Sequence, residues 1–149
     1  MILRLNLGSG CRTIKDGGWI RIDWNPDCKP DIVHDLNEGL PMYDDESVDK
    51  ILARGVLMAL NNPVFQLREW WRVLKDHGEL ELRLPLVDIS LVAACNDPDH
   101  KHLWASRTLE YFLSPGASWY GFNRGWYQRL KPPETDNEHR VEVWRKMKL

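Results

Sequence analysis

The sequence predicts an α/β fold built on a doubly wound, mostly parallel sheet. Short apolar runs alternate with polar connections along the first 85 residues, as expected when strands alternate with crossovers. The first apolar run leads directly into Gly8-Ser9-Gly10. This arrangement is typical of a buried strand that ends in a tight turn, where the backbone can approach a ligand.

Five short runs are the candidate parallel strands, and the connections between them are short. The strands are expected at residues 2–7, 19–23, 32–34, 48–53 and 79–84. About eleven residues separate the first two, close to the minimum for a crossover helix. The next connection contains Pro26 and Pro30 and is too short for any helix. We therefore expect one face of the sheet to be thinly covered.

One long helix is predicted over residues 62–78. Asn62-Pro63 provides a capping residue and a proline in the first turn, and Gly78 marks the end. The apolar stripe expected to face the sheet is Val64, Leu67, Trp71 and Leu74, widened by Phe65, Trp70 and Val73. The strand at residues 79–84 alternates leucine with charged residues, so it is expected to be half exposed.

The C-terminal third predicts a short helix at residues 106–113, followed by an antiparallel hairpin. The runs at residues 118–131 and 140–148 are rich in aromatic and β-branched residues, and a polar turn separates them. The chain contains eight tryptophans in all. The aromatic rings of this third suit either core packing and cross-strand pairs or a stacking floor for a sugar or base.

An acid at the end of the second strand extends the glycine pattern toward a ligand site. Asp23 is placed to bind a ribose at the carboxyl edge of the sheet. Thr13 stands where a dinucleotide fold requires its third glycine, and the chain has no Gly-Lys-Ser/Thr, so pyrophosphate fits poorly. A nucleotide-like cofactor is expected, and a plain tight turn is the alternative interpretation of the glycines.

Five motifs in order carry a resemblance to a known family. They are Leu5-Asn6-Leu7-Gly8-Ser9-Gly10, Ile22-Asp23, His34-Asp35-Leu36, Ser47-Val48-Asp49-Lys50-Ile51 and the segment from Trp71 to Gly78. Over residues 3–85 the chain resembles the class I S-adenosylmethionine-dependent methyltransferases, in particular their compact methyltransferase-domain, type 11-like group. The resemblance implies a Rossmann-like, seven-stranded sheet ending in an antiparallel hairpin, with minimal helices on one face. It also implies a single domain over residues 1–149 and S-adenosylmethionine as the cofactor.

The resemblance assigns roles to individual residues. The cofactor-binding residues that it implies are Leu7, Gly8, Ser9, Gly10, Asp23, Asp35 and Leu36, and the position of Arg54 after the fourth strand adds it as a further candidate. Asp23 would accept hydrogen bonds from the two ribose hydroxyls, which suits a carboxylate. Asp35 would receive the adenine amino group, although a loop-capping role is the alternative. Arg54 would face the cofactor carboxylate or an anionic acceptor, or else would only be solvated.

The chain departs from the family after the fourth strand. Gly55, Met58 and Ala59 replace the two histidines and the glutamate that this group carries there. The catalytic or substrate roles of those groups therefore cannot be transferred. The expected function is methyl transfer to an O or N acceptor, a small molecule or sugar-like compound. Two alternatives stay open, a non-catalytic S-adenosylmethionine-binding or partner-binding module and another Rossmann-type nucleotide-binding protein.

His100 and His102 are the candidate catalytic residues. They lie in the polar segment 97–104, which is expected to form a mobile cover over the acceptor side, and a histidine there has a pKa suited to accepting a proton. Asp97 and Asp99 beside them invite a metal interpretation, and a surface-loop pair is the other alternative. No metal is expected, since a sulfonium methyl is already activated and few further ligands lie nearby.

Composition agrees with one enzyme-sized domain in the cytoplasm. The chain has 149 residues, 43% of them hydrophobic, and a net charge of −2, which offers no general attraction for nucleic acid. No run reaches the length of a membrane span, and the start does not resemble a signal peptide. The three cysteines lack C-x-x-C spacing, which favours a reducing compartment. Cys11 is expected to be a small packed residue, with a nucleophile as the alternative.

Overall fold

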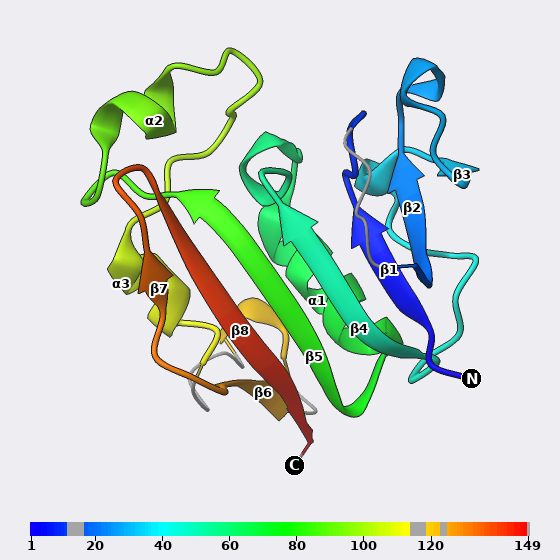
Figure 1. Ribbon diagram of the computed structural model, residues 1–149. Helices are drawn as coiled ribbons and strands as arrows, with labels where there is room; N and C mark the ends of the chain where they lie inside the picture. Colours follow the sequence, from blue (N-terminus) through cyan, green and yellow to red (C-terminus); the bar gives the residue numbers. More distant parts are fainter. Residues whose placement is uncertain (12–16, 114–118, 123–124, 149) are drawn as a thin grey trace.

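The computed structural model describes residues 1–11, 17–113, 119–122 and 125–148 (Figure 1). It confirms the doubly wound sheet, with strand order β3-β2-β1-β4-β5-β8-β6. The strands are β1 (Arg4–Leu7), β2 (Trp19–Asp23), β3 (Ile32–Val33), β4 (Val48–Arg54), β5 (Leu74–Pro85), β6 (Gly125–Arg129), β7 (Glu134–Thr135) and β8 (His139–Lys148). The pairs among β1 to β5 are parallel, and β8 pairs antiparallel with both β5 and β6.

The expected seven strands form the continuous path, and β7 is an eighth that the sequence did not predict. This two-residue strand pairs with β8 through Glu134 opposite Val141 and Thr135 opposite Arg140. It falls in the polar segment predicted to be only a turn. The antiparallel hairpin itself is confirmed, with Gly125 opposite Lys148 at one end of the β6–β8 pairing.

Few helices accompany the sheet. Within the described ranges, the α-helices are α1 (Pro63–Val73), α2 (Leu91–Cys95) and α3 (Ser106–Glu110), and the 3₁₀ turns include η1 (Pro26–Cys28), η2 (Leu36–Glu38) and η3 (Leu57–Ala59). The connection between β2 and β3 holds only η1, as its prolines predicted. Any crossover helix between β1 and β2 would include residues 12–16, which lie outside the described residues. The sequence did not predict α2, and α3 is shorter than the helix expected over residues 106–113.

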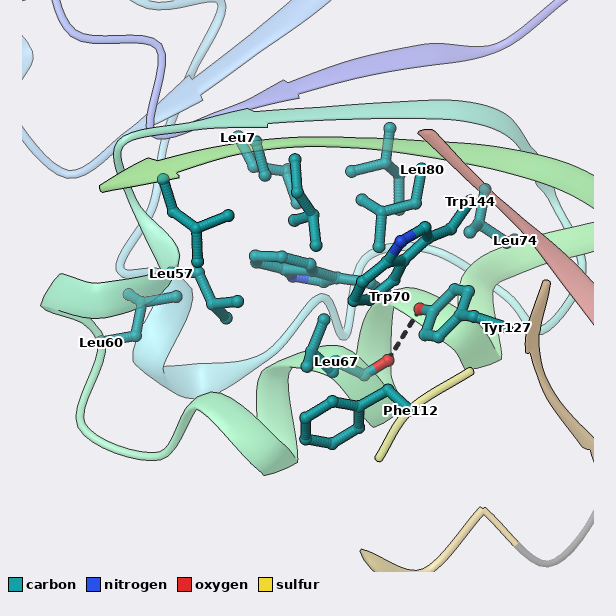
Figure 2. Packing of buried hydrophobic residues seen from close by; sticks show 14 of the residues in the cluster. Leu7, Leu57, Leu60, Leu67, Trp70, Leu74, Leu80, Phe112, Tyr127 and Trp144 are labelled. Carbon is teal, nitrogen blue, oxygen red and sulfur yellow. Dashed lines mark hydrogen bonds between the residues drawn. The ribbon is translucent and has the colours of Figure 1, made fainter. Parts of the chain in front are cut away.

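Helix α1 packs behind the sheet and supplies the centre of the core (Figure 2). Leu67, Trp70 and Val73 are fully buried against strand residues that include Leu80 and Trp144. The predicted apolar stripe centred on Trp71, whereas the buried face of the helix centres on Trp70, so the prediction was off by one residue. The Trp71 indole instead lies at the edge of the core, donating to the Trp126 carbonyl at 3.4 Å.

The predicted end of this helix was wrong. It ends at Val73, and Leu74 is already extended and paired with Val48 in the sheet. The backbone N–H groups of Glu46 and Ser47 donate to the Arg72 and Val73 carbonyls at 3.0 and 2.9 Å. The last helical carbonyls thus find partners in another segment, and β5 begins five residues earlier than expected.

One face of the sheet carries no described helix. In Figure 1 this face is turned toward the viewer and α1 lies behind it. A row of charged residues crosses it, with Arg4, Lys50, Glu79 and Arg145 on four neighbouring strands. Lys50 and Glu79 pair at 2.6 Å. The expectation of a thinly covered face is met, and charged side chains take the place of a helical layer.

Candidate functional site

A cavity of about 640 Å³ opens at the carboxyl ends of β1, β2 and β4. The residues that line it are Gly8, Asp23, Trp24, Val33, His34, Asp35, Leu36, Asn37, Glu38, Val56, Ala59, Leu60, Asp99 and Lys101. This is the edge at which open α/β sheets bind ligands. Its volume falls within the range of about 300–1,000 Å³ typical of small-molecule sites.

The turn after β1 requires glycine at Gly8. Its backbone is left-handed, with φ 61°, and a Cβ there would lie 2.5 Å from a methyl of Val56. The N–H groups of Gly8 and Ser9 both donate to the Ile22 carbonyl, at 2.9 and 3.2 Å, which holds the turn against β2. Gly10 is also left-handed, with φ 55°, but a Cβ there would meet no atom of the described chain within 4 Å.

Asp23 is a nearly buried carboxylate at the floor of the cavity, only 6% exposed. Its Oδ2 accepts the Gly10 N–H at 2.7 Å, and its Oδ1 accepts the Asn25 N–H at 2.9 Å. Backbone donors thus fix the orientation of both oxygens. A carboxylate oxygen has two acceptor positions, so each oxygen keeps capacity for one more donor, such as a hydroxyl of a ligand.

Asp35 has the capping role that was the alternative interpretation, and it also lies at the cavity. It caps η2, because its Oδ1 accepts hydrogen bonds from the backbone and the side chain of Asn37, each at 2.9 Å. It also lines the cavity, next to the buried Leu36. Since both hydrogen bonds of the cap use Oδ1, Oδ2 is not needed for the cap and suits a ligand amino group.

The structure separates Arg54 from the other candidate cofactor residues. Its guanidinium donates to Glu81 Oε1 at 2.7 and 3.2 Å, on the face of the sheet without helices. It does not line the cavity. Of the remaining candidates, Leu7, Ser9 and Gly10 do not line the cavity either: the side chain of Leu7 is buried in the core, and Ser9 and Gly10 belong to the turn that follows Gly8.

The two candidate catalytic histidines also lie outside this cavity. The His100 ring contacts the Ala94 carbonyl at 3.0 Å, and the His102 ring contacts the Asn61 carbonyl at 3.2 Å. Their neighbours Asp99 and Lys101 line the cavity instead. The backbone N–H groups of Lys101 and His102 both donate to the Met58 carbonyl, so the segment 97–104 is attached to η3.

His102 contributes to a second cavity of about 210 Å³. Its other lining residues are Pro63, Val64, Leu103, Trp104, Thr108, Tyr111, Phe112 and Tyr120. The Phe112 ring lies 6.1 Å from that of Trp104 and 5.5 Å from that of Tyr120. Trp104 and Phe112 are buried, whereas Tyr111 is 46% exposed, so these rings serve the core and also present aromatic surface.

Sequence reasoning missed several residues of the first cavity. Trp24 lines the cavity and is 71% exposed, which is unusual for a tryptophan and indicates a contact surface. Its position directly after Asp23 is a signal from which the sequence could have predicted this. Val56, Ala59 and Leu60 belong to the segment that departs from the family. These residues line the cavity only because the segment around η3 packs against Gly8. No local sequence pattern indicates this packing.

The structure also corrects the expectation for the cysteines. Cys11 and Cys28 form a disulfide, whereas Cys11 was expected to be a packed thiol in a reducing compartment. Cys95 is unpaired and exposed. Spacing could not reveal this pair, because the two residues meet only through the adjacency of the first turn and η1.

Neither a metal-ligand cluster nor a membrane-spanning helix occurs in the described part of the chain. There, no three His, Cys, Asp or Glu side chains come together in an arrangement able to hold a metal ion. Among the same residues, no helix is long and apolar enough to cross a membrane.

Comparison with known proteins agrees with this geometry. A family model described as a methyltransferase domain matches residues 23–82. That span contains Asp23, Asp35, Leu36 and the segment through β4 and α1. Over these residues the chain is similar to methyltransferase domains, in agreement with the resemblance that its motifs carry. No curated protein matches it significantly.

Solved structures show the same fold at low sequence identity. A SAM-dependent methyltransferase from Archaeoglobus fulgidus is 16% identical with a TM-score of 0.69, over 97% of this chain and 86% of that one. The [4+2]-cyclase SpnF is 15% identical with a TM-score of 0.71, over 99% and 76%. A possible histamine N-methyltransferase from Thermotoga maritima is 17% identical with a TM-score of 0.67, over 97% and 82%.

The family match supports S-adenosylmethionine as the cofactor and methyl transfer as the general activity. The first cavity offers what such a cofactor needs. Asp23 presents free acceptor positions beside the glycine turn, and Asp35 with Leu36 lies farther along the same wall. We call this cavity the cofactor cavity.

Proposed function

We propose that the protein transfers the methyl group of S-adenosylmethionine to an oxygen or nitrogen atom of a small, sugar-like or ring-containing molecule. The observation that carries this proposal is the buried Asp23 carboxylate, held by the Gly10 and Asn25 N–H groups with acceptor positions free toward the cofactor cavity. Two vicinal hydroxyls are the ligand groups that such a carboxylate binds best. In this proposal Asp35 and the Leu36 backbone receive the adenine.

The chemistry asked of this chain's residues is positional. They must hold the sulfonium methyl about 3 Å from the acceptor atom and exclude water. Where the acceptor carries a proton, one residue must also remove it. Val56, Ala59 and Leu60 form the apolar part of the wall, which suits the exclusion of water near the reacting carbon.

The second cavity supports a ring-containing acceptor. Its walls are Trp104, Tyr111, Phe112 and Tyr120, and its rim includes His102. Aromatic faces bind planar or sugar rings through apolar contact and favourable stacking. The segment that lines it also supplies Asp99 and Lys101 to the cofactor cavity, so the two cavities share one stretch of chain.

Proton removal has two candidates in that stretch. His102, with His100 beside it, has the more suitable ordinary pKa but must turn away from the Asn61 carbonyl to reach an acceptor. Asp99 already lines the cofactor cavity. We propose His102 as the proton acceptor for a substrate held in the second cavity, with Asp99 as the direct alternative.

Turnover with methyl-labelled S-adenosylmethionine and a panel of hydroxy and amino compounds tests both points. His102→Ala should lower kcat by about 10²–10⁴-fold, the usual contribution of general base catalysis, with the affinity for S-adenosylhomocysteine unchanged. Asp99→Asn is the matched variant and should keep most of the activity. The reverse pattern would assign proton removal to Asp99, and an equal loss of cofactor affinity in His102→Ala would contradict its placement.

A non-catalytic domain is the second candidate. Gly55, Met58 and Ala59 replace the family's polar groups, and Met58 is buried with its carbonyl engaged by the segment 97–104. One protein of this fold is a [4+2]-cyclase, so the fold does not by itself require methyl transfer. Formation of S-adenosylhomocysteine with any acceptor of the panel would exclude this candidate.

A further inference from the structure

The disulfide between Cys11 and Cys28 joins the two segments that form the ribose end of the cofactor cavity. Cys11 follows Gly10 at the end of the glycine turn, and Cys28 is the last residue of η1. The two cysteines are 17 residues apart in the sequence. The segment that the bond closes contains the whole of β2 and Asp23.

Hydrogen bonds complete a ring between the two sulfur atoms. Gly10 and Asn25 donate their N–H groups to the two oxygens of Asp23, at 2.7 and 2.9 Å. The Cys28 N–H in turn donates to the Asn25 carbonyl at 3.3 Å. Asp23 therefore lies within a closed ring of hydrogen bonds and covalent bonds that the disulfide completes. Reduction of the disulfide removes the covalent link between the Gly10–Cys11 end and the Asn25–Cys28 end of this ring.

The disulfide is open to reagents. Cys11 is exposed and Cys28 is half-buried, while neither residue lines the cofactor cavity. A thiolate of a dithiol can attack one sulfur to give a mixed disulfide, which the second thiol resolves. The protein disulfide gains two electrons and two protons and becomes two thiols, and the dithiol is oxidised to its own disulfide.

We propose that Cys11 and Cys28 form a reversible thiol–disulfide modification site that sets the affinity of the cofactor cavity. The disulfide form holds Gly10 and Asp23 in place before the ligand arrives, so less ordering is needed on binding. The dithiol form binds the cofactor more weakly.

This proposal rests on the cofactor of the proposed function, and it has a reciprocal consequence. If the disulfide raises the affinity for the cofactor by some factor, then bound cofactor must favour the disulfide over the dithiol by the same factor. The coupling can therefore be measured from either side, by ligand titration or by redox equilibrium.

Calorimetric titration with S-adenosylhomocysteine should compare the oxidised protein with protein reduced by dithiothreitol, each checked by counting free thiols. One thiol is expected in the oxidised form, that of Cys95. We expect the Kd to rise about 5- to 150-fold on reduction, the usual range of coupling between sites. Cys28→Ser should bind like the reduced form and ignore dithiothreitol, whereas the matched control Cys95→Ser should keep the full redox response.

Equilibration in glutathione buffers, with and without S-adenosylhomocysteine, gives the second readout. Saturating ligand should shift the disulfide–dithiol equilibrium by the factor found in the titration. Equal affinity in the two states, or three free thiols after oxidation, would overturn the proposal. A protein that forms the disulfide but binds S-adenosylhomocysteine in neither state would instead contradict the cofactor assignment, and the coupling with it.

Discussion

At the scale of single residues, the cofactor turn contains two glycines with different requirements. Gly8 is needed by the protein itself, because a side chain there would overlap Val56. Gly10 has the same left-handed backbone but faces open space next to Asp23. No described atom opposes a side chain at Gly10, so we expect its effect to fall on a ligand that approaches the Asp23 carboxylate.

Gly10→Val should abolish S-adenosylhomocysteine binding and lower the free energy of unfolding by only about 1–2 kcal/mol, the usual cost of a left-handed backbone for an L-residue. Gly18→Val is the matched control. Gly18 also has a positive φ, 95°, and open space around its Cβ position, and it precedes β2 at the end away from the cavity. Both variants should lose similar stability in urea unfolding, and normal binding by Gly10→Val would mean that the turn has no role in ligand binding.

At the scale of elements, α1 shows which signals are local. Asn62 and Pro63 predicted the start of the helix correctly, because the Asn62 side chain accepts the Phe65 N–H within the same turn. The predicted end of α1 at Gly78 was wrong, because a glycine in the sequence is only a local signal for a helix end. The actual end depends on Glu46 and Ser47, whose N–H groups take the last helical carbonyls.

A buried hydrogen bond helps to join the C-terminal hairpin to α1. The hydroxyl of the fully buried Tyr127, on β6, donates to the Leu67 carbonyl at 2.9 Å (Figure 2). Burial raises the pKa of this hydroxyl, so it remains a donor at all ordinary pH values. The bond links segments 60 residues apart in the sequence.

Tyr127→Phe should lower the free energy of unfolding by about 0.5–1.5 kcal/mol, the usual net value of such a bond. The urea midpoint should fall with an unchanged m-value, since the change leaves the folded surface intact. Tyr111→Phe, at a position that is 46% exposed, is the matched control and should be nearly neutral. An equal effect of the two variants would show that the Tyr127 bond contributes nothing to the docking of the hairpin.

At the scale of the whole molecule, ion pairs explain a charge pattern that the sequence left ambiguous. The last thirty residues hold seven Lys and Arg against four acids, a mild basic bias that is insufficient to indicate nucleic-acid binding. In the structure the buried Glu142 accepts hydrogen bonds from both Arg129 and Arg140, and Glu46 pairs with Lys146 and Lys148. Most of this basic character is therefore used inside the fold.

Acid should destabilise the protein through carboxylates that the fold stabilises in their ionised form. The Leu3 N–H and then Lys75 lower the pKa of Asp49, and Arg72 lowers that of Glu69. Backbone N–H groups lower the pKa of Asp136 to about 2. The pKa values of these carboxyl groups are lower in the folded than in the unfolded protein. Their contribution to folding stability is therefore fully present above the unfolded pKa values, and it is lost as the pH falls through the folded pKa values.

Urea midpoints should therefore change little between about pH 7 and 5 and fall between about pH 4.5 and 2, the interval between the unfolded and folded pKa values. Asp49→Asn should lower the midpoint at neutral pH and flatten this dependence. A midpoint that rises on acidification through this interval would contradict the assignment.

The parts of the site that the sequence predicted are those set by spacing along the chain. Gly8, Asp23 and Asp35 follow strand ends, so the parallel topology alone brings them to one edge. The placements that differ depend on contacts between distant segments. Arg54 donates a hydrogen bond to Glu81 on the neighbouring strand, the His102 ring contacts the Asn61 carbonyl, and Cys11 forms a disulfide with Cys28.

Direct titration of S-adenosylhomocysteine into the oxidised protein tests the central claim, that Asp23 binds the cofactor ribose in this cavity. We expect one site per chain, and Asp23→Ala should weaken it by about 10- to 150-fold, equivalent to about 1.5–3 kcal/mol for hydrogen bonds to a charged group. Asp31→Ala, which removes a carboxylate that pairs with Arg21 outside the cavity, should bind normally. Unchanged affinity in Asp23→Ala, or binding of NAD or ATP in preference to S-adenosylhomocysteine, would contradict the account.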